Sequence, residues 1–149
     1  MSLKMTQDER QAFLADLHVG VISIQDPDRG PLSTPIWYDY QPDVGLWIIT
    51  SRSSKKGVAL DRAGRFSLVA QTEEPPMYKY VSVEGPIVEV RPADKEKDLR
   101  PMARRYFGPP LGDAYVESSP VDDGHVFVMQ PQRWLTVDYA KSGQQAETS

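Results

Sequence analysis

The chain is 149 residues long, with 40% hydrophobic and 26% charged residues, a composition typical of one globular domain with a buried core. Its formal net charge of −4 argues against a nucleic-acid partner, because proteins that bind nucleic acids usually carry a basic excess. The absence of cysteine excludes disulfides, zinc–thiolate sites and a cysteine nucleophile, and it favours a cytoplasmic protein. No apolar run reaches the roughly 18 residues that cross a bilayer, so we expect no membrane span.

The first part of the sequence predicts a helix and then an antiparallel meander. The helix is predicted from Thr6 to Leu17, because Thr6 and Glu9 match a capping box and the apolar residues that follow share one face. Runs rich in β-forming residues predict strands at 19–24, 32–40 and 46–50. The connections are too short for crossover helices, so we expect hairpins. Pro35 indicates an edge position or a bulge in the second strand.

The rest of the sequence alternates strands with helices. A short helix is predicted from Ser53 or Ser54 to about Arg62. The further predictions are strands at 65–71, 78–90, 126–129 and 135–139, a helix at 94–106 and a loop at 108–124. Glu84-Gly85-Pro86 indicates a bulge or bend inside the long strand, and Pro101 is expected to kink the second helix.

Together these elements predict an α+β, mainly β fold. Six or seven antiparallel strands with two or three short helices, mostly joined by hairpins, favour a barrel. No linker or repeat divides the sequence, so residues 1–149 are expected to form a single domain. Residues 1–5 are compatible with a leader and residues 141–149 with a polar tail.

A cluster of hydroxyl and basic side chains lies where the third predicted strand gives way to a helix. It consists of Thr50, Ser51, Arg52, Ser53, Ser54, Lys55 and Lys56. A helix start offers unpaired backbone N–H groups and the positive end of the helix dipole, while hydroxyl and basic groups add hydrogen bonds and positive charge. The cluster is therefore a candidate phosphate site. From these residues alone, the alternative is a capped helix start with solvated lysines.

Aromatic residues on two neighbouring predicted strands form a second candidate. The stretches Pro35-Ile36-Trp37-Tyr38 and Leu46–Thr50 align Trp37 and Trp47 with hydroxyl groups and backbone amides. Such a wall can stack against a planar heterocycle or hydrogen-bond to it. The alternative that both tryptophans belong to the core stays open at this point.

The stretch from Tyr78 to Gly85 is a third candidate. Alternation along a strand places Val81 and Val83 on one face, and on the other face Tyr78, Tyr80, Ser82 and Glu84. The second face is available to a ligand or a partner subunit, or it is an ordinary exposed strand face.

Other kinds of site find little support. The two histidines, His18 and His125, have neither the spacing of a catalytic triad nor that of a metal site. The patterns GxSxG, HExxH, Walker A and GxGxxG are all missing from the sequence. We therefore expect no metal site, no hydrolytic triad and no Rossmann-type nucleotide site.

Several stretches of the sequence, in their order along the chain, resemble the FMN-binding split β-barrel proteins related to pyridoxamine 5′-phosphate oxidase. Among these proteins, the sequence is most similar to the small actinobacterial flavin- and deazaflavin-dependent oxidoreductases. The resemblance spans nearly the whole chain and is carried by His18–Ile22, Gly30-Pro31, Ser33–Tyr38, Leu46–Ile48, Ser54–Lys56 with Leu60, Arg65–Leu68, Tyr80–Gly85 and Arg133–Leu135. The sequence departs from the family at Ala59, where relatives often carry an asparagine, and this removes a polar contact near the phosphate region.

The resemblance implies a six- to seven-stranded split barrel that forms a homodimer, with two cofactors bound at the interface. Lys56 is the best match to the family's phosphate-binding lysine, and the supporting residues are Lys55, Ser54, Ser51 and Thr50. The residues expected along the ring system are Thr34, Pro35, Ile36 and Trp37. Those expected to approach from the second subunit, or to cover the substrate side, are Tyr78, Tyr80 and Trp134.

The function implied by the resemblance is hydride transfer between a bound cofactor and a small organic substrate. Coenzyme F420 and FMN are the two candidate cofactors, and the overall pattern is nearer to the deazaflavin branch. Catalytic side chains are not evident, and Tyr80 is the candidate proton donor. Two alternatives stay open: a non-catalytic flavin-binding or storage protein of the same fold, and a barrel without a cofactor.

Overall fold

The computed structural model describes residues 2–119 and 123–142, which form four α-helices, one π-helical turn and eight β-strands. In chain order these are α1 (Gln7–Ala15), β1 (Gly20–Ile24), β2 (Leu32–Ile36), β3 (Asp39–Gln41), β4 (Gly45–Ser51), α2 (Lys55–Ala63), β5 (Arg65–Gln71), β6 (Lys79–Pro92), the π-helical turn η1 (Lys95–Leu99), α3 (Arg100–Phe107), α4 (Pro109–Ser118), β7 (Gly124–Met129) and β8 (Arg133–Asp138). Within the described ranges, no helix is both long enough and apolar enough to cross a membrane.

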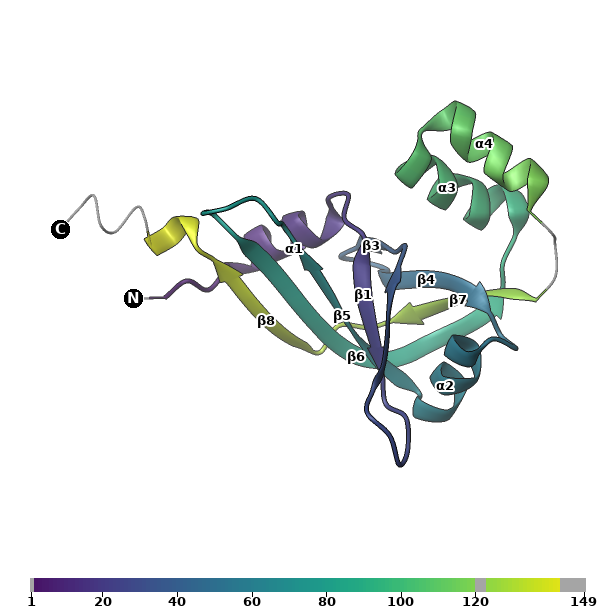
Figure 1. The fold of residues 1–149 in the computed structure, drawn as a ribbon, viewed down its shortest axis with the longest axis horizontal. Coiled ribbons are helices and arrows are strands. Elements are labelled where there is room, and N and C mark those ends of the chain that lie inside the picture. The colour runs from purple at the N-terminus through teal and green to yellow at the C-terminus, as the bar shows by residue number, and fades with distance from the viewer. Residues whose placement is uncertain (1, 120–122, 143–149) are drawn as a thin grey trace.

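The strands form one curled antiparallel sheet in the order β2-β1-β5-β6-β7-β4-β3, and β8 pairs with β6 outside this path (Figure 1). The long strand β6 belongs to both halves of the sheet. Its first half pairs with β5 and β8, and its second half pairs with β7. The register shifts between Ile87 and Glu89, which marks a bulge that bends β6. The predicted fold class, an antiparallel split barrel, is confirmed.

The bend in β6 coincides with a close approach of backbone at Gly85. A Cβ atom at this position would lie 1.9 Å from the backbone oxygen of Gln130, so a side chain here would collide with the connection between β7 and β8. The bulge or bend predicted from Glu84-Gly85-Pro86 is confirmed, with the register shift directly after these residues.

The core lies on the inner face of the strands. Alternate strand residues supply it, among them the fully buried Ile22, Ile24, Leu46, Ile48, Leu68, Val81, Val83, Phe127 and Met129. Leu14 of α1 and Leu60 of α2 complete the same cluster. The apolar residues that alternate along the strands in the sequence therefore line the interior of the barrel.

Helix α1 begins as the sequence predicts. The hydroxyl of Thr6 accepts a hydrogen bond from the amide of Glu9 at 3.2 Å, and the carboxylate of Glu9 accepts one from the amide of Thr6 at 2.7 Å. The helix ends at Ala15, two residues before the predicted end at Leu17. After Ala15 the chain enters β1.

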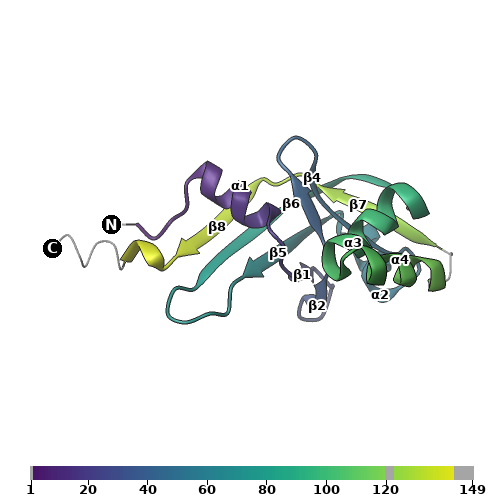
Figure 2. The same ribbon diagram turned by 90° about the horizontal axis from the view of Figure 1, so that it is seen from above.

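Helices α3 and α4 form a hairpin at the opposite end of the molecule from the termini (Figure 2). Arg100 joins them through ion pairs to Asp113 at 2.8 Å and Glu117 at 2.6 Å. Arg104 adds a second pair to Asp113 at 2.8 Å. These charged contacts hold the two helices of the hairpin together on the surface.

Two details of the predicted elements are corrected by the structure. The strand predicted at 32–40 is interrupted at Trp37 and Tyr38, so that β2 pairs with β1 and β3 pairs with β4. The loop predicted at 108–124 contains α4, because prolines in the first turn of a helix need no amide donor. The first change raises the strand count to eight, and the second raises the helix count above three.

The N-terminal segment before α1 contacts the barrel. The amide of Met5 donates to the hydroxyl of Thr136 at 3.0 Å, and the amide of Asp138 donates to the carbonyl of Leu3 at 2.8 Å. Residues 2–5, compatible with a leader in the sequence, thus lie against β8. Residue 1 and residues 143–149 of the predicted leader and tail lie outside the described residues.

Candidate functional site

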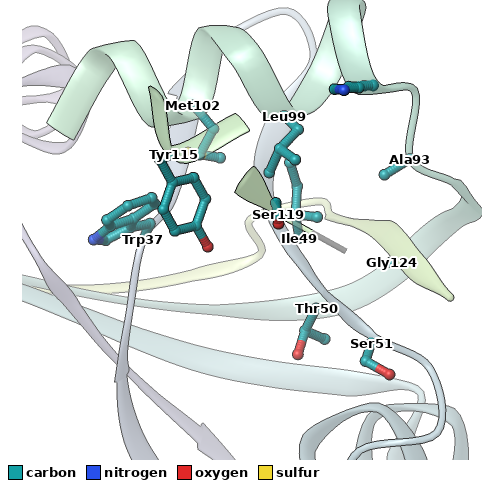
Figure 3. Close-up of a pocket in the computed structure, with 11 residues that line it drawn as sticks. Trp37, Ile49, Thr50, Ser51, Ala93, Leu99, Met102, Tyr115, Ser119 and Gly124 are labelled. Atoms are coloured by element: carbon teal, nitrogen blue, oxygen red, sulfur yellow. The ribbon is translucent and has the colours of Figure 1, made fainter. Parts of the chain in front are cut away.

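A cavity of about 440 Å³ lies between the α3–α4 hairpin and the face of β4 that is turned away from the core (Figure 3). It is lined by Trp37, Ile49, Thr50, Ser51, Ala93, Lys95, Leu99, Met102, Tyr115, Ser119 and Gly124. Aromatic and aliphatic side chains form one end, while Thr50 and Ser51 bring hydroxyl groups to the other. A concave, mostly apolar cavity with a few polar groups is typical of a small-molecule site.

Trp37 is the centre of an aromatic cluster at one end of the cavity. Its ring stacks on Tyr106 with centroids 4.9 Å apart and an interplanar angle of 5°. It contacts Phe107 edge-on at 4.9 Å and Tyr115 at 5.5 Å. Phe107 and Tyr115 stay more than two fifths exposed, so the cluster presents aromatic surface to the outside. The wall predicted from Trp37 and Trp47 on neighbouring strands is wrong, because Trp47 is not among the residues that line the cavity. The aromatic neighbours of Trp37 come from α3 and α4.

Hydrogen bonds fix this aromatic end to the barrel. The hydroxyl of Tyr106 donates to the carbonyl of His18 at 2.6 Å and accepts from the amide of Tyr38 at 3.0 Å. The guanidinium of Arg105 donates to the carbonyls of Tyr38 at 3.1 Å and Asp16 at 2.8 Å. Burial raises the pKa of the Tyr106 hydroxyl, so it stays a hydrogen-bond donor at neutral pH.

The other end of the cavity opens at the β4–α2 loop (Ser51–Lys56). Ser54 caps α2, since its hydroxyl accepts from the amide of Gly57 at 3.1 Å and donates to the carbonyl of Ser51 at 2.6 Å. A Cβ on Gly57 would lie 2.2 Å from the Ser51 oxygen and 2.5 Å from the Arg52 oxygen. The first turn of α2 therefore packs directly on the loop backbone. That turn contains the amides of Lys55 and Lys56, which an α-helix leaves without an intrahelical partner.

The carboxylate of Asp123 lies against this loop. It accepts hydrogen bonds from the hydroxyl of Ser51 and from the amide of Ser53, the latter at 2.9 Å. The amide of Arg52 donates to the backbone oxygen of Asp123 at 3.1 Å. The bonds from Ser51 and Ser53 lower the pKa of Asp123 to about 2. The donors of the loop thus already hold one oxyanion, so their chemistry fits the oxygens of a phosphate.

Three positive charges lie in or beside the loop. Arg52 pairs with Asp61 at 2.9 Å, and both side chains are exposed. Lys55 is exposed and Lys56 is half-buried, and neither forms an ion pair within residues 2–119 and 123–142. Two of the three charges are therefore available to an anionic ligand.

A family model described as pyridoxamine 5′-phosphate oxidase matches residues 6–138. The chain belongs to this family. The split-barrel family that the resemblance indicates is thereby confirmed. No curated protein matches the chain in sequence.

Solved structures share the fold of this family member at low sequence identity. The conserved hypothetical protein Rv2991 from Mycobacterium tuberculosis has a TM-score of 0.74 and 23% identity, covering 94% of this chain and 89% of its own. An F420 reductase has a TM-score of 0.66 and 17% identity, covering 84% and 94%. HutZ, the heme storage protein from Vibrio cholerae, has a TM-score of 0.63 and 16% identity, covering 93% and 96%. At these identities the similarity shows the fold, and the fold alone does not choose the ligand.

The residues that the family resemblance assigns to the phosphate lie together. Thr50 and Ser51 line the cavity, Ser54 is the N-cap of α2, and Lys55 and Lys56 occupy the first turn of that helix. The cavity and the loop meet at Ser51. The two lysines themselves are not among the residues that line the cavity.

Three of the residues assigned to the ring system lie on the two faces of β2, and Trp37 follows this strand. Thr34 and Ile36 lie opposite Ile22 and Gly20 of β1, with Ile36 buried in the core. Pro35 is exposed on the outer face of this edge strand. The buried hydroxyl of Thr34 has no hydrogen-bond partner in the described part of the chain. Of the four assigned residues, Trp37 lines the cavity.

The three residues expected from a second subunit lie at or beside β6 and β8, in the half of the sheet that does not contain β4. Tyr80 faces outward, opposite to the fully buried Val81 and Val83, as the alternation predicts. Trp134 packs on the core, with the guanidinium of Arg10 4.4 Å from its ring centroid. Tyr78 is exposed just before β6. None of the three lines the cavity in the described part of the chain.

The sequence did not point to Asp123, Lys95 or Tyr115. Asp123 and Tyr115 fall in the segment predicted as a loop, and a helix start at Gly108-Pro109-Pro110 was the available signal for α4. Asp123 had no local signal, because it reaches Ser51 across 72 residues of sequence. Within the described residues there is no group of three or more His, Asp or Glu side chains placed to hold a metal ion.

Proposed function

We propose that the protein is an oxidoreductase that transfers hydride between a bound coenzyme, coenzyme F420 or FMN, and a small organic substrate. The observation that carries the proposal is the meeting of two features at Ser51. One is a loop whose hydroxyl and amide groups hold an oxyanion, and the other is a cavity of about 440 Å³ with an aromatic end. A phosphorylated planar coenzyme needs both features.

The β4–α2 loop would hold the phosphate. Lys56 and Lys55 would contribute charge and first-turn amides, while Ser51 and Thr50 would contribute hydroxyl groups and Ser54 would hold the helix start in place. When bound, the coenzyme supplies hydride transfer, and the protein supplies position and electrostatics. Trp37 and the α3–α4 hairpin would orient a planar ring and exclude water from the cavity.

We further propose a homodimer with the coenzyme at the interface. Val21, Val69, Ser82 and Leu135 are aligned across β1, β5, β6 and β8 on the outer face of the sheet. Val21 is 41% exposed and Leu135 is 63% exposed, so this row presents apolar surface. In such a dimer, Tyr78 and Tyr80 of one subunit would approach the site of the other. Light scattering should give twice the chain mass, and Leu135→Glu should yield monomers; a monomeric wild type would refute the dimer.

The candidate proton donor stays Tyr80, now as a group supplied by the partner subunit. Tyr80→Phe should lower turnover while coenzyme affinity is unchanged. An unchanged rate in Tyr80→Phe would remove this role.

A non-catalytic coenzyme-binding or storage protein is the second candidate. Its support is the composition of the cavity lining, which includes no His, Asp or Glu in the described residues. The two candidates share the binding site and differ in turnover. Reduction of an organic acceptor by protein loaded with reduced coenzyme, at a rate above that of free coenzyme, would favour the enzyme.

The binding proposal is tested by titrating the purified protein with FMN and with coenzyme F420, using flavin or deazaflavin fluorescence as the signal. We expect saturable binding of at least one of them in the wild type and at least tenfold weaker binding in Lys56→Gln, since a charge-assisted phosphate contact contributes about 1.5–3 kcal/mol. Asp43→Asn, in the exposed turn between β3 and β4, is a control far from the loop. Absence of binding for both coenzymes would refute the proposal.

A further inference from the structure

The anion already held by the β4–α2 loop belongs to the protein itself. Asp123 precedes β7, and the next residue, Gly124, pairs with Ser51 in the β4–β7 ladder. The amide of Arg52 also donates to the Asp123 backbone oxygen at 3.1 Å. The backbone of Asp123 is therefore fixed beside the loop by two sets of contacts, whatever its side chain does.

The carboxylate of Asp123 takes the same donors that a ligand phosphate would use. Both of its oxygens are engaged, one by the hydroxyl of Ser51 and the other by the amide of Ser53. A phosphate can bind to the loop in two ways. It can displace the Asp123 carboxylate, whose side chain then rotates away, or it can bind the first-turn amides of α2 next to the carboxylate. In both cases a negative charge stays within a few ångströms of the bound phosphate.

We propose that Asp123 shifts the coenzyme preference of the loop toward a phosphodiester and away from a phosphomonoester. This inference rests on the proposed function and adds a coenzyme class to it. A phosphomonoester such as FMN carries a charge of about −1.5 to −2 at neutral pH, because its second proton dissociates near pH 6. The phosphate of coenzyme F420 is a diester and carries a single negative charge.

Repulsion by Asp123 grows in proportion to the charge on the phosphate that lies in the loop. A unit charge at about 5 Å from another in a solvated site changes a binding constant by roughly three- to fourfold. A doubly charged monoester should suffer the square of that factor, roughly tenfold. The neighbouring Lys55 and Lys56 attract the doubly charged monoester more strongly by the same law, so Asp123 offsets part of their preference. The Asp123 variants isolate this contribution, because the two lysines stay unchanged in them.

The test compares wild type, Asp123→Asn and Asp123→Ala in fluorescence titrations with FMN, coenzyme F420 and riboflavin, which has no phosphate. We expect both Asp123 variants to bind FMN about tenfold more tightly and coenzyme F420 about threefold more tightly, with riboflavin unchanged. Asp43→Asn is the matched control, because it removes the same charge from an exposed turn and should leave all affinities unchanged.

Weaker binding of both coenzymes in the Asp123 variants would overturn the inference, since it would mean that Asp123 holds the loop in its binding conformation. An equal gain for FMN, coenzyme F420 and riboflavin would overturn it as well. Methyl phosphate and dimethyl phosphate, followed through the amide NMR signal of Ser53, separate this inference from the proposed function. A gain for methyl phosphate in Asp123→Asn supports the inference even if neither coenzyme binds, in which case only the proposed function fails. Absence of any phosphate binding refutes both.

Discussion

Gly57→Ala tests the loop geometry on which the phosphate site depends. The added methyl group would lie 2.2 Å from the Ser51 oxygen, 2.5 Å from the Arg52 oxygen and 2.7 Å from the Arg52 carbonyl carbon. Ordinary van der Waals contact begins near 3.4 Å. All three atoms belong to the backbone, so the first turn of α2 has to move away from the loop by roughly 1 Å.

The displacement lowers both the stability of the protein and its affinity for phosphate. Overpacking of this kind costs about 1–3 kcal/mol, and the higher helix propensity of alanine offsets up to about 1 kcal/mol of it. We expect the free energy of unfolding to fall by about 1–2 kcal/mol, which corresponds to a Tm lower by about 2–8 °C. The shift also separates the amides of Lys55 and Lys56 from the Ser51 hydroxyl. Loss of one such contact weakens phosphate binding by roughly tenfold or more.

Differential scanning calorimetry and FMN titration measure the two effects on the same samples. Gly30→Ala is the matched control, because a Cβ at Gly30 has nothing within 4 Å and the position does not have a positive φ. It should leave Tm and coenzyme affinity unchanged. The reasoning is refuted if Gly57→Ala keeps wild-type Tm and wild-type affinity.

Three further predictions concern the aromatic end of the cavity and the helix that supports it. Tyr106→Phe should lower the free energy of unfolding by about 1–3 kcal/mol in urea titrations, because the Tyr38 amide and the His18 carbonyl lose their partner; a change within error would show that water replaces the hydroxyl. Trp37→Leu should weaken FMN binding while the affinity for methyl phosphate stays constant, and an equal loss for both ligands would argue against ring stacking by Trp37. Burial lowers the pKa of His18 below its ordinary value of about 6.5. The contribution of His18 to the free energy of unfolding is therefore complete above about pH 6.5 and declines as the pH falls below this value, because the unfolded chain then binds the proton more readily. Wild type should therefore lose more stability than His18→Gln between pH 7.5 and pH 5.5, and parallel curves for the two proteins would contradict this.

The strands and the fold class could be predicted because their signals are local. Alternation at Val81 and Val83, the capping box at Thr6 and the turn residues between strands each specify one element, and the structure agrees with them. The interruption at Trp37 could not be read in this way. Its conformation is set by stacking on Tyr106, which comes from α3 much later in the chain.

The sequence predicted the β4–α2 loop of the candidate site, but neither the α3–α4 hairpin nor the position of Asp123. Ser51, Ser54 and Lys56 form a continuous stretch whose chemistry is visible in sequence. Tyr115 lies on a helix that starts with two prolines, a pattern that resembles a loop when it is judged residue by residue. Asp123 meets Ser51 through the pairing of β4 with β7, which only the sheet topology determines.

The central claim is that the β4–α2 loop anchors the phosphate of a redox coenzyme. Its most direct test is the dissociation constant of wild type and Lys56→Gln for FMN and coenzyme F420, measured beside riboflavin. The account predicts binding of at least one phosphorylated coenzyme, at least tenfold weaker in Lys56→Gln, with the affinity for riboflavin equal in both proteins. Equal coenzyme affinities in the two proteins, or no coenzyme binding in wild type, would contradict it.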